Sequence, residues 1–226
     1  MKKIIGAIAI CITAYLIYQF VQTSPDKMPL FPKTLEKIAS GQSVTIVTYG
    51  DSITKGKTND NYPSMLKQEL RNIFPNSEIK IINSGMSGAT SFEAKEHIQQ
   101  KVLSLTPDAV IVEFGWNDLA KRYPIEDFIS NMTYTIEQLQ PHTELALITT
   151  TRVNIGLANY AIRSYNKEIK NIAKKYKIPV IDIYGAWGKA IKDGNSLKSL
   201  LNEDNIHPNI KGHKIISDTI IKRLKQ

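Results

Sequence analysis

The sequence contains few of the residues that build disulfides and metal centres. It holds one cysteine and four histidines in 226 residues. A single cysteine excludes an internal disulfide and any cysteine-rich zinc site. Four scattered histidines, His97, His142, His207 and His213, argue against a histidine-cluster metal centre. We therefore expect no bound metal, so any chemistry must come from ordinary side chains.

Arginine-rich blocks are also absent, although the chain as a whole is basic. The 29 lysines and arginines outnumber the 21 acidic residues, which gives a formal net charge of +8. Lysines such as Lys167, Lys170 and Lys174 are spread along an expected helix, and no aromatic residues alternate with them as in a nucleic-acid platform. We interpret the surplus as solvated helix surfaces or as a match to an anionic cell envelope, and we predict no binding of nucleic acid.

Charge is missing from the N-terminal stretch of residues 4–21, which follows Lys2 and Lys3. Its length is close to that of a membrane span, and Tyr15, Tyr18 and Phe20 gather at its far end as in an interfacial aromatic belt. We predict that residues 1–21 are a membrane anchor that leaves the rest of the chain exported on the outer face of the membrane. A cleaved signal peptide is the alternative, but no small-x-small cleavage site follows the stretch.

Three prolines lie close together just after this stretch. Pro25, Pro29 and Pro32 stand among polar residues, and closely spaced prolines favour extended chain. We predict an extended linker over residues 22–40, and a single domain over residues 41–226 that is long enough to bury a core.

Within this domain, apolar β-rich runs alternate with stretches of helical periodicity. Helices of this length between strands are typical of parallel βαβ units. Near-continuous apolar strands, such as residues 109–114, indicate a sheet covered on both faces. The sequence therefore predicts an α/β fold, a three-layer α/β/α sandwich with a five-stranded parallel sheet. The expected strands are 43–49, 78–82, 109–114, 145–150 and 180–183, and the expected helices are 62–74, 91–103, 125–139, 160–176 and 210–224.

Small and polar residues follow the first three of these strands. Ser52 comes directly after Gly50 and Asp51, Gly85 follows the second strand, and Asn117 follows the third. Taken singly, each could serve an ordinary turn or a helix cap. Because the carboxyl ends of parallel strands share one edge of the sheet, we expect these three to converge there. A serine at such an edge is a candidate nucleophile.

A fourth polar segment precedes the last expected helix. Asp204 stands three residues before His207, on what we expect to be a loop. A carboxylate at this spacing can hydrogen-bond the imidazole and orient it, which leaves the other ring nitrogen to act as a general base toward a serine. His97, His142 and His213 lack such a partner on a loop, and we interpret them as structural.

Together these segments resemble the four ordered blocks of the SGNH (GDSL) hydrolase family. The first block is similar to Gly50-Asp51-Ser52-Ile53, with isoleucine in place of leucine, and the second centres on Gly85. The third is Gly115-Trp116-Asn117-Asp118 and the last Asp204-Asn205-Ile206-His207. The resemblance implies a flavodoxin-like fold and hydrolysis of esters or thioesters without a metal or other cofactor.

The resemblance also assigns roles to these residues. Ser52 would be the nucleophile, His207 the general base and Asp204 the residue that orients His207. The backbone N–H groups of Ser52 and Gly85 and the side-chain amide of Asn117 would form the oxyanion hole. Asp51 would brace the turn, and Trp116 would either line the substrate pocket or pack in the core.

Three functions remain open at this point. The leading hypothesis is an exported, membrane-tethered serine esterase that hydrolyses short-chain acyl esters. The second is an O-acetyltransferase or deacetylase that acts on a cell-envelope polymer, since both would pass through the same acyl-enzyme. The third is a non-catalytic envelope-binding module that kept the fold. The expected partners are a small acyl ester, or an acylated glycan or lipid of the envelope, together with the membrane through residues 4–21.

Overall fold

The computed structural model describes residues 24–226 of the chain. The predicted membrane anchor or signal peptide over residues 1–21 lies outside the described residues. Within residues 24–226, no helix combines the length and the apolar character that a membrane crossing needs.

The centre of the molecule is a parallel sheet of five strands in the order β2-β1-β3-β4-β5. The predicted α/β fold is therefore confirmed. In this order the chain leaves β1 toward one side for β2 and then crosses to the other side for β3, so a crevice opens between the carboxyl ends of β1 and β3. The strands are β1 (Val44–Gly50), β2 (Ile79–Asn83), β3 (Ala109–Glu113), β4 (Glu144–Ile148) and β5 (Val180–Ile181).

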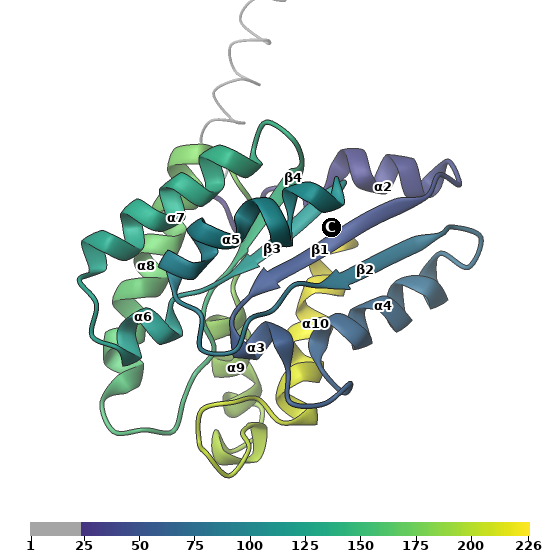
Figure 1. Cartoon of the computed structure of the whole chain (residues 1–226). Helices are drawn as coiled ribbons and strands as arrows, with labels where there is room; N and C mark the ends of the chain where they lie inside the picture. Colours follow the sequence, from purple (N-terminus) through teal and green to yellow (C-terminus); the bar gives the residue numbers. More distant parts are fainter. Residues whose placement is uncertain (1–23) are drawn as a thin grey trace, which may run out of the picture.

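Helices cover both faces of the sheet, as the apolar strands predicted (Figure 1). Alternate side chains point to opposite faces, so Ile46 and Ile111 join one core cluster while Val47 and Val110 join the other. The first face is covered by α2 (Pro32–Ala39), α4 (Tyr62–Ile73), α9 (Ile183–Lys192) and α10 (Ile210–Leu224), and the second by α5 (Ser91–Lys101), α7 (Ile125–Leu139) and α8 (Ala158–Tyr176).

Short helices that the sequence did not predict stand near the carboxyl ends of the strands. They include α3 (Ser52–Lys55) after β1 and α6 (Trp116–Ala120) after β3. The arrowheads of β1 and β3 point toward the end of the molecule where these two helices lie (Figure 1). The predicted strand 180–183 ends at residue 181, because the Asp182 carboxylate accepts the Gly185 N–H and so begins α9.

The prediction of an extended linker over residues 22–40 is wrong, because much of this segment is folded onto the domain. Residues 32–39 form α2, with Pro32 in the first turn, where its missing N–H costs nothing. Leu30 and Phe31 are buried in the core of the first face, and Val180 at the start of β5 donates its N–H to Pro25 O (2.8 Å). Pro32 therefore begins a helix, and the residues before it pack onto the domain instead of forming a spacer.

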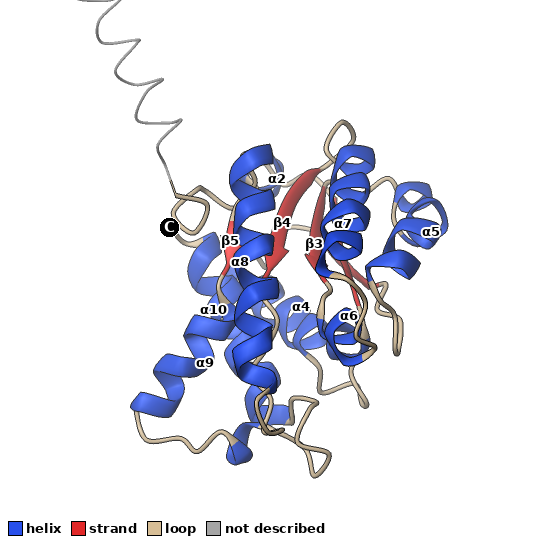
Figure 2. Ribbon diagram, turned by 90° about the vertical axis from the view of Figure 1, so that its left-hand side faces the viewer, coloured by secondary structure: helices blue, strands red, loops and turns tan. Residues whose placement is uncertain are grey.

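A carboxylate from the sheet fastens the N-terminal end of α2. Glu144, at the start of β4, accepts the backbone N–H groups of Lys33 (3.1 Å) and Thr34 (2.7 Å) and also the Thr34 hydroxyl (2.8 Å). Negative charge is favourable at this end of a helix, where the amide groups have no partner inside the helix. Figure 2 shows the resulting position of α2, at the end of the sheet opposite α6.

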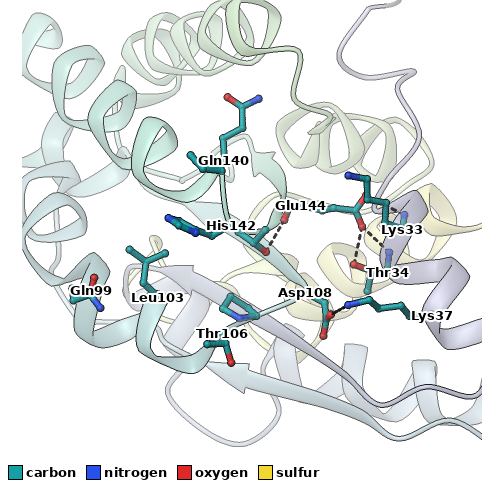
Figure 3. Close-up of a pocket in the computed structure, with 13 residues that line it drawn as sticks. Lys33, Thr34, Lys37, Gln99, Leu103, Thr106, Asp108, Gln140, His142 and Glu144 are labelled. Carbon is teal, nitrogen blue, oxygen red and sulfur yellow. Dashed lines mark hydrogen bonds and ion pairs between the residues drawn. The ribbon is translucent and has the colours of Figure 1, made fainter.

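A cavity of about 700 Å³ opens at this same end of the sheet (Figure 3). Its walls include Lys37, Asp108, His142 and Glu144. The acidic groups are committed to structural contacts, since Glu144 binds α2 and Asp108 accepts Lys37 Nζ at 2.6 Å and Thr45 N–H at 2.8 Å. The cavity is therefore lined by α2 and by the end of the sheet where β4 starts, and it lies away from the polar carboxyl ends of the strands.

Candidate active site

Ser52 lies at the carboxyl end of β1, at the first position of α3. Asp51 precedes it as the N-cap, and Asp51 Oδ1 accepts the backbone N–H of Ile53 at 2.8 Å. This cap turns the chain sharply from strand to helix, so the Ser52 hydroxyl is presented at the edge of the sheet. The N–H of Ser52 has no acceptor within the helix, because the first amides of any helix lack one.

The structure brings His207 and Asp204 to this serine across 155 positions of sequence. Ser52 Oγ and His207 Nε2 are 2.8 Å apart, and His207 Nδ1 and Asp204 Oδ2 are 3.0 Å apart. With Asp204 ionised, Nδ1 must carry the proton it donates to that carboxylate, which leaves Nε2 as an acceptor for the serine hydroxyl. The three side chains therefore have the order and spacing that a general base needs to activate a serine.

Backbone and side-chain hydrogen bonds hold the loop that carries His207. Asn202 N–H donates to His207 O (2.9 Å), and the Asn202 side chain donates to Pro208 O (2.9 Å). On its outer side the loop is tied to the segment after β4, because Asn154 donates from its backbone N–H to Asn205 O (2.8 Å) and from its side chain to Asn205 Oδ1 (2.9 Å). These hydrogen bonds fix the position of the imidazole, although no strand directly precedes the loop that carries it.

Every hydrogen bond to the Asp204 carboxylate favours its ionised form. Partial burial would raise the pKa of Asp204, but the Lys57 ammonium, the N–H groups of His207 and Ile206 and the imidazole together hold it well below its usual range. Oδ1 accepts both N–H groups at 2.9 Å, whereas Oδ2 accepts His207 Nδ1 and also Lys57 Nζ, the latter at 2.5 Å. Sequence analysis missed Lys57, which stands 147 positions before its partner.

Gly85 follows β2 and passes close to the end of α3. A Cβ at this position would lie 2.3 Å from Lys55 N and 2.6 Å from Lys55 Cα, so no other residue fits without moving backbone. The N–H of Gly85 donates to Asn83 Oδ1 at 2.9 Å. The glycine therefore lets the second strand end pack against the helix that begins with Ser52.

Asn117 lies in the first turn of α6, on the other side of the crevice from Ser52. It follows Gly115, whose φ of +130° is accessible to few residues other than glycine. The Asn117 side-chain amide donates to Asp51 Oδ2 (3.1 Å) and to Ala89 O (2.9 Å). Ser52, Gly85 and Asn117 thus meet around one edge, and the Asn117 amide spans the gap between β1 and β3.

Two carboxyl groups are buried directly behind the serine. Asp51 is completely buried, and Glu113, the residue paired with Gly50 in the neighbouring strand, is 2% exposed. Burial, together with the nearby charge of Glu113, raises the pKa of Asp51 well above its usual range, and burial likewise raises the pKa of Glu113. Glu113 Oε1 has no hydrogen-bond partner among the described residues, and a proton held between the two carboxyls would provide one.

Three other residues that the sequence singled out are buried. His213 is buried in α10, its Nδ1 accepts the Tyr62 N–H at 3.4 Å, and burial lowers its pKa to about 4, so it is neutral near pH 7. Trp116 is 8% exposed and packs against Val153 and Ile162. Asp118 is buried, and its carboxylate accepts the backbone N–H and the hydroxyl of Ser91.

The arrangement offers a hydroxyl nucleophile, an imidazole within hydrogen-bond distance of it and a carboxylate paired with that imidazole. Among residues 24–226, no group of three or more histidine, cysteine, aspartate or glutamate side chains is placed to hold a metal ion. Such a set of groups can carry out acyl transfer, in which the serine accepts an acyl group and the imidazole moves the proton.

Comparison with known proteins agrees with this chemistry. The sequence model of the GDSL-like Lipase/Acylhydrolase family matches residues 48–215, which contain all four polar segments. An acetylxylan esterase from Geobacillus stearothermophilus is 22% identical over 214 residues, covering 83% of this chain and 96% of the relative. The uncharacterized lipoprotein YqeF of Bacillus subtilis is 25% identical over 213 residues, covering 77% and 87%.

The fold also matches solved structures. The crystal structure of Axe2, the acetylxylan esterase from Geobacillus stearothermophilus, superposes with a TM-score of 0.73 at 20% sequence identity. The match covers 82% of this chain and 96% of that one. The fold of this chain is therefore similar to that of a solved structure.

Proposed function

The chain belongs to the GDSL-like lipase/acylhydrolase family, the SGNH hydrolases, and we propose that its active centre is the set Ser52, His207 and Asp204. It is a serine hydrolase that acts on carboxylic ester bonds. The observation that carries the proposed assignment is the pair of contacts from Ser52 Oγ to His207 Nε2 (2.8 Å) and from His207 Nδ1 to Asp204 Oδ2 (3.0 Å).

In the proposed mechanism, Ser52 Oγ attacks the acyl carbonyl while His207 Nε2 takes its proton. Collapse of the tetrahedral intermediate breaks the ester bond, and His207 returns the proton to the leaving alcohol. Water then attacks the acyl-enzyme with the same base, which releases the acid and restores the serine. Asp204 keeps the imidazole in the required tautomer and stabilises the imidazolium that forms in both steps.

We assign the oxyanion hole to the N–H groups of Ser52 and Gly85 and to the side-chain amide of Asn117. Two of these donors already have acceptors inside the protein, Asn83 for Gly85 and Asp51 with Ala89 for Asn117. A substrate oxyanion carries a full charge and is a stronger acceptor than a neutral amide oxygen, a carbonyl oxygen or the carboxyl of Asp51, since burial raises the pKa of Asp51 and favours its neutral form. It therefore competes successfully for these donors as charge develops in the transition state.

For the substrate, we propose short acyl esters, including acetyl groups on glycans of the cell envelope. An acetylxylan esterase is among the relatives, which supports an acylated carbohydrate. For the location, we propose export and attachment through residues 4–21 to the outer face of the membrane, or secretion if that segment is cleaved. The uncharged stretch after Lys2 and Lys3 and the lipoprotein relative support this assignment.

A second function shares the acyl-enzyme and differs only in the acceptor. If a sugar hydroxyl rather than water attacks the acyl-serine, the protein is an O-acetyltransferase. Incubating the full chain with an acetyl donor, with and without a glycan acceptor, separates the two. New glycan esters that depend on the acceptor indicate transfer, whereas release of acetate at an unchanged rate indicates hydrolysis.

The central proposal is tested with the full chain and short p-nitrophenyl esters. We expect hydrolysis, covalent labelling by a serine-directed phosphonate, and a labelled peptide that contains Ser52 in mass spectrometry. The Ser52→Ala variant should lose both ester hydrolysis and phosphonate labelling. The Ser199→Ala variant, on the short turn before the loop that carries His207, should retain both. Labelling at another serine would overturn the assignment, and an inert wild-type protein would favour the non-catalytic envelope-binding module.

A further inference from the structure

Lys57 lies on the loop between α3 and α4, and this loop is fixed by internal hydrogen bonds. The Asn61 side chain donates to Lys55 O (3.1 Å) and Thr58 O (2.8 Å), and its oxygen accepts the Ser64 N–H (3.0 Å) to cap α4. The loop is therefore braced on both sides of Lys57, although 57% of the lysine side chain is exposed.

Lys57 Nζ binds the oxygen of Asp204 that also binds the imidazole. The ammonium lies 2.5 Å from Asp204 Oδ2, and His207 Nδ1 lies 3.0 Å from the same atom. Two donors on one oxygen keep the ammonium and the imidazole within about 6 Å of each other, the range in which one charge shifts the pKa of another group. This placement distinguishes Lys57 from the lysines that pair with carboxylates elsewhere on the surface.

Other charged and titratable groups stand on the elements around His207. From its own loop it faces Asp204, and from α10 it faces His213, which is neutral near pH 7. Beneath Ser52 lies Asp51, whose raised pKa favours its neutral form. Arg152, on the segment that braces the histidine loop, places its guanidinium over the Tyr184 ring at 3.9 Å from the ring centre. Lys57 is therefore the cation that lies directly behind the Asp204–His207 pair.

From this arrangement we propose that Lys57 is a positioning residue that keeps His207 neutral, and therefore able to accept a proton, to lower pH than Asp204 alone would allow. Asp204 by itself favours the imidazolium, because a carboxylate stabilises a neighbouring positive charge. The ammonium on Oδ2 offsets part of that negative charge and repels the imidazolium directly. It also keeps Asp204 ionised, so the tautomer of His207 does not change.

The inference rests on the proposed function, because it describes the regulation of the same site by pH. Its consequence is an active centre suited to mildly acidic surroundings. A lysine that merely fastened the loop would contribute little to folding stability, as an exposed ion pair does, and would leave the pH dependence of hydrolysis unchanged. The pH profile therefore separates the two roles.

The test compares wild type, Lys57→Gln and Lys57→Arg as full chains, with Lys37→Gln as a matched control. Lys37 pairs with Asp108 at 2.6 Å, but at the opposite end of the sheet. We expect Lys57→Gln to raise the midpoint of the acidic limb of kcat/KM by about half a pH unit, a value discounted for the exposure of the pair. Lys57→Arg and Lys37→Gln should keep the wild-type midpoint.

Salt provides a second measurement on the same proteins. Because the Lys57 ammonium is exposed, about 1 M NaCl should move the wild-type midpoint toward that of Lys57→Gln, and move the variant's own midpoint less. If the midpoints of wild type and Lys57→Gln agree in low and high salt, the inference is overturned while the proposed function stands.

Titration of the His207 ring by NMR tests the inference without any substrate. The ring signals, assigned from their loss in His207→Asn, should titrate at higher pH in Lys57→Gln than in wild type. If the NMR midpoint shifts but no protein hydrolyses an ester, the inference holds and the proposed function fails. If neither the NMR nor the kinetic midpoint shifts, Lys57 only fastens its loop.

Discussion

Asn117 donates its side-chain amide to Asp51 Oδ2 over 3.1 Å, so the residue before the proposed nucleophile holds a proposed oxyanion-hole donor that comes from a different strand end. This contact links the ends of β1 and β3 across the crevice of the sheet. It holds the amide at the crevice before substrate arrives, and the amide would exchange one of its two acceptors, Asp51 Oδ2 or Ala89 O, for the oxyanion as charge develops in the transition state.

The first prediction concerns this amide. We expect Asn117→Ala to lower kcat by about 10²–10³, with a smaller change in KM, because the amide acts on the charge that develops in the transition state. Steady-state kinetics on p-nitrophenyl acetate would measure the loss. A matching fall in phosphonate labelling is expected, since the phosphonyl oxygen occupies the same place. Unchanged kcat would exclude Asn117 from the oxyanion hole.

The second prediction concerns the partner of the imidazole. Asp204→Asn preserves shape but offers an amide to His207 Nδ1, which favours the wrong tautomer. We expect kcat to fall by about 10⁴ while the thermal midpoint of unfolding changes little. Asp218→Asn, a surface carboxylate that pairs with Lys214, serves as the control and should be fully active. Equal activities of the two variants would contradict the assigned role.

The third prediction concerns the buried carboxyls Asp51 and Glu113. Burial raises both pKa values, so the native protein retains a proton that the unfolded chain releases above pH about 4. Stability from this pair is complete below that pH and is lost as the pH rises toward the native pKa values. Glu113→Gln removes one of the two charges and should flatten this decline.

The comparison of wild type with Glu113→Gln is made by denaturant unfolding from pH 4 to 9. The free-energy difference between them should move in favour of the variant with rising pH, by up to about 1.4 kcal/mol per unit. Glu78→Gln, on an exposed loop before β2, should run parallel to wild type. Parallel curves for Glu113→Gln would mean that the pair holds no shared proton.

The fourth prediction tests whether the segment before the sheet belongs to the folded domain. Phe31 is 2% exposed, so Phe31→Ala should destabilise the protein by about 3–5 kcal/mol. Leu157 is 88% exposed, and Leu157→Ala should leave the unfolding free energy unchanged within about 0.5 kcal/mol. If Phe31→Ala were equally mild, residues before α2 would not contribute to the core.

Much of the fold was predictable because its signals are local. The apolar runs identified all five strands, and the bounds 125–139 and 210–224 agree with α7 and α10. Two errors have physical causes. Side-chain caps, such as that of Asp51 on α3, begin helices too short to show a periodicity. Pro32 stands in a helical first turn, which the proline spacing alone could not distinguish from an extended chain.

The residues of the candidate site were likewise predictable only where they form local sequence patterns. Strand ends and the Asp204–His207 spacing are local patterns, and parallel strand order places them on one edge. Contacts that form only when distant segments of the chain come together leave no local pattern in the sequence. Glu113 lies behind Asp51 only because Gly50 pairs with Glu113 between neighbouring strands, and Lys57 reaches Asp204 only because two distant loops meet.

The start of the described chain and the serine lie at opposite ends of the sheet. Pro25 contacts the start of β5 and Thr34 the start of β4, whereas Ser52 comes two residues after the end of β1, a strand of seven residues that spans roughly 23 Å. If the protein were attached to a surface through the residues before position 24, the end of the sheet opposite Ser52 would therefore face that surface. The proposed active site at Ser52 would then open away from that surface, so the substrates it could reach would be those in the space beyond the domain.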